Sequence, residues 1–399
     1  MNTVLHLPDL LLAISLLLGI SAVVIPVARR FGIGPELGLL LSGVILGSSH
    51  FLGETQVDRL RELSELGVVF FLFMIGLELD LGKAWQLRRY ALVLGSLQVL
   101  ATGMVLMFYW YFFTFSWSLS LLIGLVLANS STALVFQVLE RKQELNEEHG
   151  RAAFAVLLFQ DLTVVPIMAL VPVFAGTGSA DYSWWNILPA VATMALLFIA
   201  GRYLCPWLFH LAIVKRMPET FTAVLFVAIL GSAWSAHHVG LSMALGAFIM
   251  GVALSGTDYR HKLQEEVMPF KNFLLGMFFV SVGLTVDVTV LSQHTGKILM
   301  HVLVILAVKT AVLYIAARAI RMDHTPAARL SFLLAQAGEF TFVILGTLLT
   351  VGVVTHTQFA NGIMVVALTT IMTSWLDALG VTFGRLSRAG VSKPNISTS

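Results

Sequence analysis

Three charged residues lie deep inside apolar stretches of the sequence, where ionisable groups are rare. Asp161, Lys309 and Glu339 each fall near the middle of a hydrophobic run. An ionisable group inside a lipid bilayer is costly unless it is paired or solvated, so each of the three is a candidate for function. One cation and two carboxylates at similar depth suit a charge-compensated ion site. The alternative interpretation is a structural ion pair that holds helices together.

Small polar residues accompany Asp161 in a pattern that suits an alkali cation. Gln160 precedes the carboxylate, and a run of amide and hydroxyl side chains falls in the middle of another apolar stretch. Carboxylate, amide and hydroxyl oxygens are the ligands that hard cations prefer. We therefore predict that Asp161 binds either a proton or a cation, K+ or Na+. The residues expected to complete the cation's shell are Gln160, Asn129, Ser130, Ser131 and Thr132. The hydroxyl run is also compatible with simple interhelical hydrogen bonding.

Two segments are expected to interrupt their helices. Residues 129–132 and the Gln-Ala-Gly-Glu run at 336–339 are poor helix formers by transmembrane standards. If each unwinds, the half-helices expose N–H groups at one end and carbonyl groups at the other. We expect Glu339 to neutralise N–H groups in its own break, and Lys309 to pair with Asp161 or to tune its pKa. Both would compensate charge at the site.

The composition places these residues in a membrane. Of 399 residues, 58% are hydrophobic and only 12% are charged, and the mean hydropathy is +0.89. A soluble domain carries about twice that charged fraction. Cys205 is the only cysteine, and no histidine or cysteine cluster has metal-ligand spacing, so we expect no disulfide and no cofactor. We expect a single transmembrane domain over 1–399, with lipid around it and no nucleic-acid partner.

The hydrophobic runs predict an all-α polytopic protein with about 13 transmembrane helices. The spans are 8–28, 36–50, 65–80, 89–113, 117–140, 151–176, 185–213, 219–236, 239–255, 270–287, 296–320, 327–351 and 358–384. The seventh span is long and contains Arg202, so we expect it to divide into a span and an interfacial helix. Asp377, near one end of the last span, suits either an intramembrane role or a cap.

The distribution of cations supports this set of spans. The odd-numbered loops and the C-terminal segment hold nineteen Lys and Arg residues, whereas the even-numbered loops hold only Arg59, Arg61 and Lys297. One missed or extra span would scramble this division. By the positive-inside rule, the C-terminus is cytoplasmic and the N-terminus lies outside.

Weak internal similarity predicts two inverted repeats. Leu127-Ala128-Asn129 matches Leu334-Ala335-Gln336 at an offset of 207 residues, and the motifs at 76–80 and 283–287 share that offset. Gly43-Val44 matches Gly251-Val252 at 208. Matching spans are seven apart, an odd number, so the halves insert with opposite topology, as is typical of secondary transporters. We predict six-helix repeats at about 8–176 and 219–384, joined by a linker helix at 185–213.

Several motifs carry a resemblance to a known family. From about residue 8 to residue 388 the sequence resembles the transmembrane part of the Kef-type glutathione-gated potassium efflux antiporters, within the sodium/proton-antiporter-like superfamily. The motifs are Gly76-Leu77-Glu78-Leu79-Asp80, the stretch Ala153 to Asp161 ending in Phe-Gln-Asp, Gly240-Leu241-Ser242 with Gly246-Ala247-Phe248, Tyr259-Arg260-His261 with Pro269-Phe270-Lys271, and Gln336-Ala337-Gly338-Glu339-Phe340.

The resemblance implies a fold with a dimerisation domain and a mobile core domain, in which spans 5 and 12 are broken helices that cross. It implies that Gln160 and Asp161 form the ion site, that Lys309 is the intramembrane lysine of the eleventh helix, and that the protein is a homodimer in a bacterial inner membrane. It also implies a regulatory cytoplasmic loop, with candidate residues His261, Gln264, Glu265 and Glu266. Kef-type proteins continue into a nucleotide-binding domain, and no Gly-rich phosphate loop follows span 13 in this sequence. We therefore expect either a truncated sequence or a member without that domain, and these residues do not support glutathione gating.

We therefore expect a secondary transporter that exchanges a monovalent cation, K+ before Na+, for protons by alternating access at one carboxylate. One alternative is a gated potassium channel, but no Gly-rich selectivity-filter sequence occurs. A second is a Na+-coupled organic-anion symporter on the same fold, since the dipoles of broken helices can hold carboxylates. An enzyme is not expected, because the His-Glu-x-x-His motif of a metal-dependent hydrolase is missing.

Overall fold

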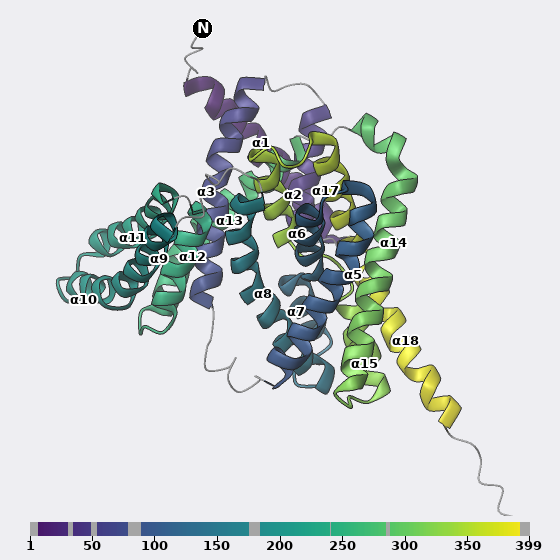
Figure 1. The fold of residues 1–399 in the computed structure, drawn as a ribbon. Helices are drawn as coiled ribbons and strands as arrows, with labels where there is room; N and C mark the ends of the chain where they lie inside the picture. The colour runs from purple at the N-terminus through teal and green to yellow at the C-terminus, as the bar shows by residue number, and fades with distance from the viewer. Residues whose placement is uncertain are drawn as a thin grey trace, which may run out of the picture. The chain divides into compact units, whose positions relative to one another are not determined.

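The computed structural model describes residues 7–30, 35–48, 54–78, 89–174, 184–239, 241–284 and 288–391, and in these ranges the regular structure is entirely helical (Figure 1). The chain forms two compact units. Unit 1 comprises Met1–Leu81, Met168–Gln293 and Leu345–Ala360. Unit 2 comprises Gly82–Ile167, His294–Ile344 and Asn361–Ser399, and it contains all the residues expected at the ion site.

Unit 1 is built around a set of packed helices from both halves of the chain. Its helices are α1 (Leu7–Arg30), α2 (Pro35–Ser48), α3 (Glu54–Glu78), α9 (Trp184–Ile199), the π-helix η2 (Ala200–Leu204), α10 (Cys205–Val214), α11 (Pro218–His238), α12 (Met243–Ser255) and α13 (Arg260–Leu284). Its main apolar core includes Phe73 of α3, Phe209 of α10, Leu225 of α11 and Leu254 of α12, all fully buried. Burial of such side chains in one shared core fixes how these helices pack together.

Two pairs of glycines allow close approach of helices inside unit 1. Gly43 of α2 meets Gly283 of α13, where a Cβ atom on Gly43 would lie 2.8 Å from the Cα of Gly283. Gly76 of α3 meets Gly251 of α12, where a Cβ atom on Gly251 would lie 3.1 Å from the Cα of Gly76. Small residues of this kind let helix backbones touch in membranes. The residues of one contact follow those of the other at offsets of 207 and 208, the spacing expected of the inverted repeat, which remains a prediction.

The linker segment is one continuous helix, although we expected it to divide into a span and an interfacial helix. Residues Val191–Val214 form one helical span, and the backbone widens to a π-helix at η2. Pro206 explains the wider turn, because a proline ring clashes with the carbonyl group four residues earlier, that of Arg202. The Arg202 guanidinium donates to the Gly256 carbonyl at 3.0 Å. The prediction of a span followed by a separate interfacial helix was therefore wrong.

The expected regulatory loop is also helical. His261, Gln264, Glu265 and Glu266 lie in the first two turns of α13, which begins at Arg260, well before the predicted start of span 10. Leu263 and Val267 on the same turns are fully buried, so the apolar spacing of these residues fixes a helix. Glu266 accepts a hydrogen bond from Thr222 at 3.2 Å.

Unit 2 holds the two interrupted helices. Its helices are the π-helix η1 (Arg89–Gly95), α5 (Ser96–Thr114), α6 (Trp117–Ala128), α7 (Thr132–Arg141), α8 (Glu148–Phe174), α14 (Val288–Ala319), α15 (His324–Leu333), α16 (Phe340–Thr350), α17 (His356–Ile371) and α18 (Thr373–Val391), with α8, α14, α16 and α17 extending past its boundaries. The first interruption separates α6 from α7 and the second separates α15 from α16. Both lie at the segments that the sequence predicted.

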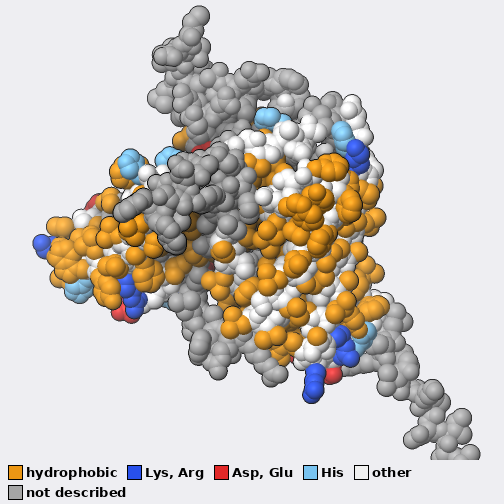
Figure 2. Space-filling view, viewed as in Figure 1, with side chains coloured by type: hydrophobic (Ala, Val, Ile, Leu, Met, Phe, Trp, Pro, Cys, Tyr) orange, Lys and Arg blue, Asp and Glu red, His pale blue; other side chains and the backbone are white. Residues whose placement is uncertain are grey.

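Six helices among the described residues are long and apolar enough to cross a bilayer, and α17 with α18, bent by 50°, would form a seventh. The halves of the two broken helices, 10 to 12 residues each, are too short to qualify alone. Exposed apolar side chains run along α5 and α14, among them Phe112 (74%) and Leu303 (63%), and Figure 2 shows hydrophobic side chains over this face. The protein is therefore a multi-pass membrane protein, and the count of 13 remains a prediction.

Candidate ion site

The two broken helices cross at their interruptions in unit 2. The backbone N–H of Gly338 donates to the Asn129 carbonyl at 3.1 Å, and the Ser130 hydroxyl donates to the Leu334 carbonyl at 2.8 Å. A Cβ atom at position 338 would lie 2.7 Å from the Ser130 carbonyl oxygen, so glycine is required for the approach. Each break thus supplies hydrogen-bond partners to the other.

Lys309 of α14 caps the C-terminal ends of α6 and α15, the first half of each broken helix. Its ammonium group, in a side chain that is only 1% exposed, donates to the carbonyl oxygens of Leu127 at 3.0 Å, Asn129 at 2.6 Å and Gln336 at 2.7 Å. An ammonium group has three hydrogens to donate, so backbone carbonyls account for all of them. The positive charge lies where the dipoles of α6 and α15 are negative. Lys309 therefore places its charge at the C-terminal ends of α6 and α15, whereas its predicted pairing with Asp161, or tuning of the Asp161 pKa, stays a prediction.

Gln160 of α8 supports the first break from the side. Its amide oxygen accepts from the Ser130 backbone N–H at 2.8 Å, and its amide nitrogen donates to the Gln98 side chain at 2.8 Å. Gln98 of α5 in turn donates, at 3.0 Å, to the carbonyl of Ala128, which is the last residue of α6. Both glutamines are 1% exposed. Gln98 was not among the predicted site residues; the available signal was an amide inside the apolar span Tyr90–Thr114.

Asp161 lies beside the first turn of α7 and is half-buried. The Thr132 hydroxyl donates to its two carboxylate oxygens, at 3.2 and 3.4 Å. Two residues along α8, the Thr163 hydroxyl donates to the Gln160 carbonyl at 2.7 Å and also lies 3.3 Å from the Asn129 amide oxygen. The Asn129 amide nitrogen donates to the Leu125 carbonyl at 3.2 Å, so this residue also closes the end of α6. A carboxylate, two hydroxyls and an amide oxygen therefore gather around the first break.

The remaining predicted residues have separate positions. Ser131 caps α7, because its hydroxyl accepts from the Leu134 backbone N–H at 3.4 Å. Glu339 is half-buried and lies immediately before Phe340, the first residue of α16.

The hydroxyl oxygens, amide oxygens and carboxylates near the crossing are hard ligands, which suit an alkali cation better than a transition metal. In the part of the chain that the structure describes, no group of three or more His, Cys, Asp or Glu residues has metal-binding geometry.

A family model described as "Sodium/hydrogen exchanger, transmembrane" matches residues 16–379. The chain belongs to this family. The exchanger is therefore a cation:proton antiporter in the broad sense, a membrane transporter and not an enzyme.

Solved structures share the fold of this exchanger. The sodium proton antiporter MjNhaP1 from Methanocaldococcus jannaschii at pH 8 is similar with a TM-score of 0.71 and 16% identity, over 95% of this chain and 100% of that chain. An electron-microscopy structure of MjNhaP1 is similar with a TM-score of 0.65 and 14% identity, over 98% of this chain and all of that chain. At these identities the likeness establishes the all-helical antiporter fold alone.

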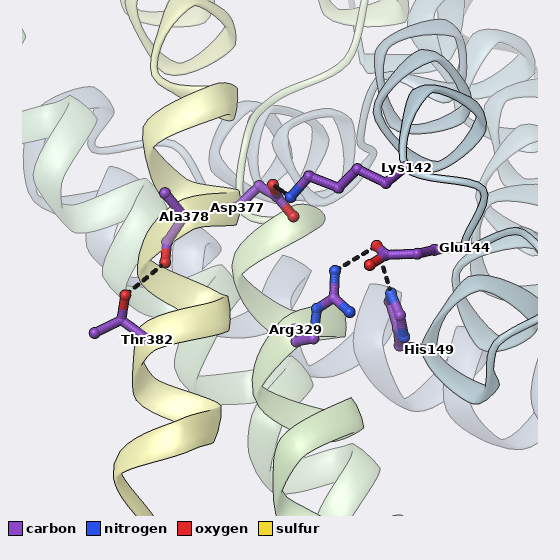
Figure 3. Close-up of polar contacts among 7 residues, drawn as sticks. All are labelled: Lys142, Glu144, His149, Arg329, Asp377, Ala378 and Thr382. Carbon is purple, nitrogen blue, oxygen red and sulfur yellow. Dashed lines mark hydrogen bonds and ion pairs between the residues drawn. The ribbon is translucent and has the colours of Figure 1, made fainter.

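A second polar cluster of the exchanger ties the segment after α7 to α15 and α18 (Figure 3). Lys142 forms an ion pair with Asp377, which is only 6% exposed, and Glu144 pairs with Arg329 and lies 3.5 Å from the His149 ring. Asp377 is thus a partner of Lys142, and the structure gives it a tethering role. Burial raises the pKa of Glu144, but the hydrogen bond and positive charge of Arg329 outweigh it and hold this pKa below its usual value.

Proposed function

We propose that this exchanger trades K+ for protons at Asp161 by alternating access. The observation that carries the proposal is the half-buried carboxylate of Asp161 at the first turn of α7, in hydrogen-bond contact with Thr132. Asp161 holds a proton or a largely dehydrated cation, never both. Either ligand neutralises the carboxylate, which lowers the cost of moving the site within the membrane.

The proposal divides the predicted shell into residues that bind the cation and residues that support the break. Thr132 contacts Asp161, and Thr163 contacts the Asn129 amide oxygen at the same break; in this proposal these groups and water complete the cation's shell. Gln160 and Ser130 use their polar groups to hold the unwound backbone. In this proposal they shape the site, and Gln160 contributes to the cation only through the second lone pair of its amide oxygen.

The choice of K+ rests on the resemblance to Kef-type antiporters. Relatives that move sodium electrogenically have two adjacent aspartates, whereas this chain has Gln160 before Asp161. A single carboxylate suits one-for-one exchange with no net charge movement. Any other stoichiometry would couple transport to the membrane potential, at about 2.3 kcal/mol per charge per 100 mV.

The proposal extends to the setting of the exchanger. We place it in a bacterial inner membrane as a homodimer, with the N-terminus outside and the C-terminus cytoplasmic, because of its loop charges and the Kef-type resemblance. Unit 2, which holds Asp161 and both breaks, takes the role of the mobile core. The exposed side chains of His261 and Glu265 on the first turns of α13, with Gln264 and Glu266 beside them, are offered to a cytoplasmic regulator.

Proteoliposomes with an imposed pH gradient test the proposal. Proton movement is followed with a pH-sensitive dye after addition of K+, Na+, Li+ or choline, for the wild type, Asp161→Asn and Asp258→Asn. Asp258 is exposed in the turn before α13 and serves as the matched control. We expect K+ to dissipate the gradient in the wild type and in Asp258→Asn only. Exchange by Asp161→Asn would refute the site, and current without proton movement would favour a channel.

A further inference from the structure

One buried amide in the second break has no partner within the protein. The side chain of Gln336 is 0% exposed, and neither its amide nitrogen nor its amide oxygen makes a hydrogen bond to any residue that the structure describes. A buried amide without partners is costly, and such groups commonly mark a site for water or an ion. The backbone carbonyl of the same residue binds Lys309 at 2.7 Å, which places Gln336 at the crossing of the broken helices.

The second break is held by its neighbouring helix in the same way as the first. In the first break, the Ser130 N–H donates to the Gln160 side chain of α8. In the second, the Ala337 N–H, 207 residues later, donates to the Thr369 hydroxyl of α17 at 3.2 Å. Thr369 therefore has the same position relative to the second break as Gln160 has relative to the first. The next residue, Thr370, whose hydroxyl lies 3.4 Å from the Ala337 carbonyl oxygen, then corresponds to Asp161.

The two breaks contain the same chemical groups with two of them exchanged. At the first break, the carboxylate comes from α8 (Asp161) and the hydroxyl from the break (Thr132). At the second, the hydroxyl comes from α17 (Thr370), and the carboxylate comes from Glu339 in the break, 207 residues after Thr132. The amide of Asn129 corresponds to the amide of Gln336. The difference is that Asn129 has protein partners, whereas Gln336 has none among the described residues.

We propose that Gln336, Glu339 and Thr370 form a second binding site for a monovalent cation at the second break. The Thr370 hydroxyl donates its hydrogen to the Val366 carbonyl at 2.8 Å, so its oxygen lone pairs remain for a cation. One carboxylate, one amide oxygen and one hydroxyl form a hard oxygen set. The fixed positive charge of Lys309 beside Gln336 disfavours a divalent ion, because repulsion grows with the charge of the ion.

The number of bound cations can be measured from the way in which K+ concentration changes the stability of the folded protein. The purified full chain is unfolded thermally over a K+ titration in which choline keeps the ionic strength constant. At high K+ the stabilisation rises with the logarithm of concentration, with a slope equal to the number of bound cations. We expect a slope that approaches two for the wild type and one for Glu339→Gln. Thr370→Ser retains the hydroxyl and keeps two, whereas Thr370→Val falls to one.

The outcomes separate this proposal from the exchange site at Asp161. A wild-type slope of one that Glu339→Gln leaves unchanged overturns the second site and indicates that Gln336 binds water only. A slope of one that is lost in Glu339→Gln but kept in Asp161→Asn supports the second site and refutes the first. If Glu339→Gln does not fold, anomalous scattering from wild-type crystals soaked in Tl+ decides: a second peak within coordination distance of Gln336 supports the proposal, and a single peak at Asp161 overturns it.

Discussion

The ammonium nitrogen of Lys309 lies 2.6 Å from the carbonyl oxygen of Asn129, the C-cap residue directly after α6. It lies 2.7 Å from the Gln336 carbonyl as well, so one side chain closes both broken helices. The unwound segments therefore depend on a charge from a third helix. In the proposed mechanism, the Asp161 carboxylate is therefore left for the transported ion, because backbone carbonyls already bind the buried lysine.

Replacement of Lys309 by methionine is expected to destabilise the protein and to abolish exchange. The variant leaves three carbonyl oxygens in a buried site without their charged donor, and each hydrogen bond to a charged group contributes about 2 kcal/mol. Thermal unfolding in detergent and proteoliposome exchange measure the two effects. Lys297→Met, an exposed position on the same helix, controls for the loss of a lysine. Normal stability in Lys309→Met would show that the carbonyls find other donors.

Gln98→Leu is expected to slow exchange about tenfold while the fold is retained. The change removes the donor to the Ala128 carbonyl and the acceptor for Gln160, and one unsatisfied buried group costs about 1–3 kcal/mol. The loosened break shifts the ligands around Asp161, so the cation KM should rise. Gln137→Leu, an exposed glutamine on α7, is the control. If Gln98→Leu and Gln137→Leu have the same exchange rate and the same cation KM, Gln98 does not support the ion site.

Gly251→Ala is expected to lower stability by about 1–3 kcal/mol, the usual cost of overpacking. An added methyl group would meet the Phe73 carbonyl oxygen and the Cα of Gly76 across the α3–α12 contact. Gly231→Ala on α11 is matched to it, because a Cβ there has no neighbour within 4 Å, and helix propensity favours alanine. The thermal unfolding temperature should fall only in the first variant. An equal response would show that the glycine contact adapts.

The Glu144–Arg329 pair should make stability depend on acidity below about pH 4.5. Because the pKa of Glu144 is lowered in the folded state, its contribution is fully present above the usual value of 4.5 and is lost as the pH falls through the lowered value. Glu144→Gln should therefore be less stable than the wild type by about 1 kcal/mol at pH 7. The difference should vanish in acid. Glu147→Gln, at an exposed position, should show no such trend.

The positions of the two breaks followed from sequence because their cause is local. Polar and glycine residues at 129–132 and 336–339 are poor helix formers in an apolar span, and the structure interrupts the helices there. The partners of Lys309 did not follow, because they are backbone carbonyls, which every residue has. Gln98 was missed for a related reason: a lone amide in an apolar span has meaning only when the opposite helix end is known.

Longer-range features limited the remaining predictions. Residues 261–266 were expected to form a loop because the Kef-type resemblance implies one there, yet buried Leu263 and Val267 make them the start of α13. A count of spans from hydropathy depends on joining half-helices that are individually too short, so the number of spans and the inverted repeat stay predictions. The paired glycine contacts at 43–283 and 76–251 are the structural feature that favours the repeat.

In the proposed mechanism one proton and one cation compete for Asp161, and the pH dependence of the K+ KM tests this competition most directly. Exchange rates in proteoliposomes are measured over a range of K+ concentrations at several pH values, with the pH equal on both sides at the start. Competition at one carboxylate predicts that the KM rises tenfold for each unit of pH decrease on the acidic limb, while saturating K+ restores the rate. A KM that stays constant with pH would mean that proton and cation bind at separate sites, and it would contradict the proposed mechanism.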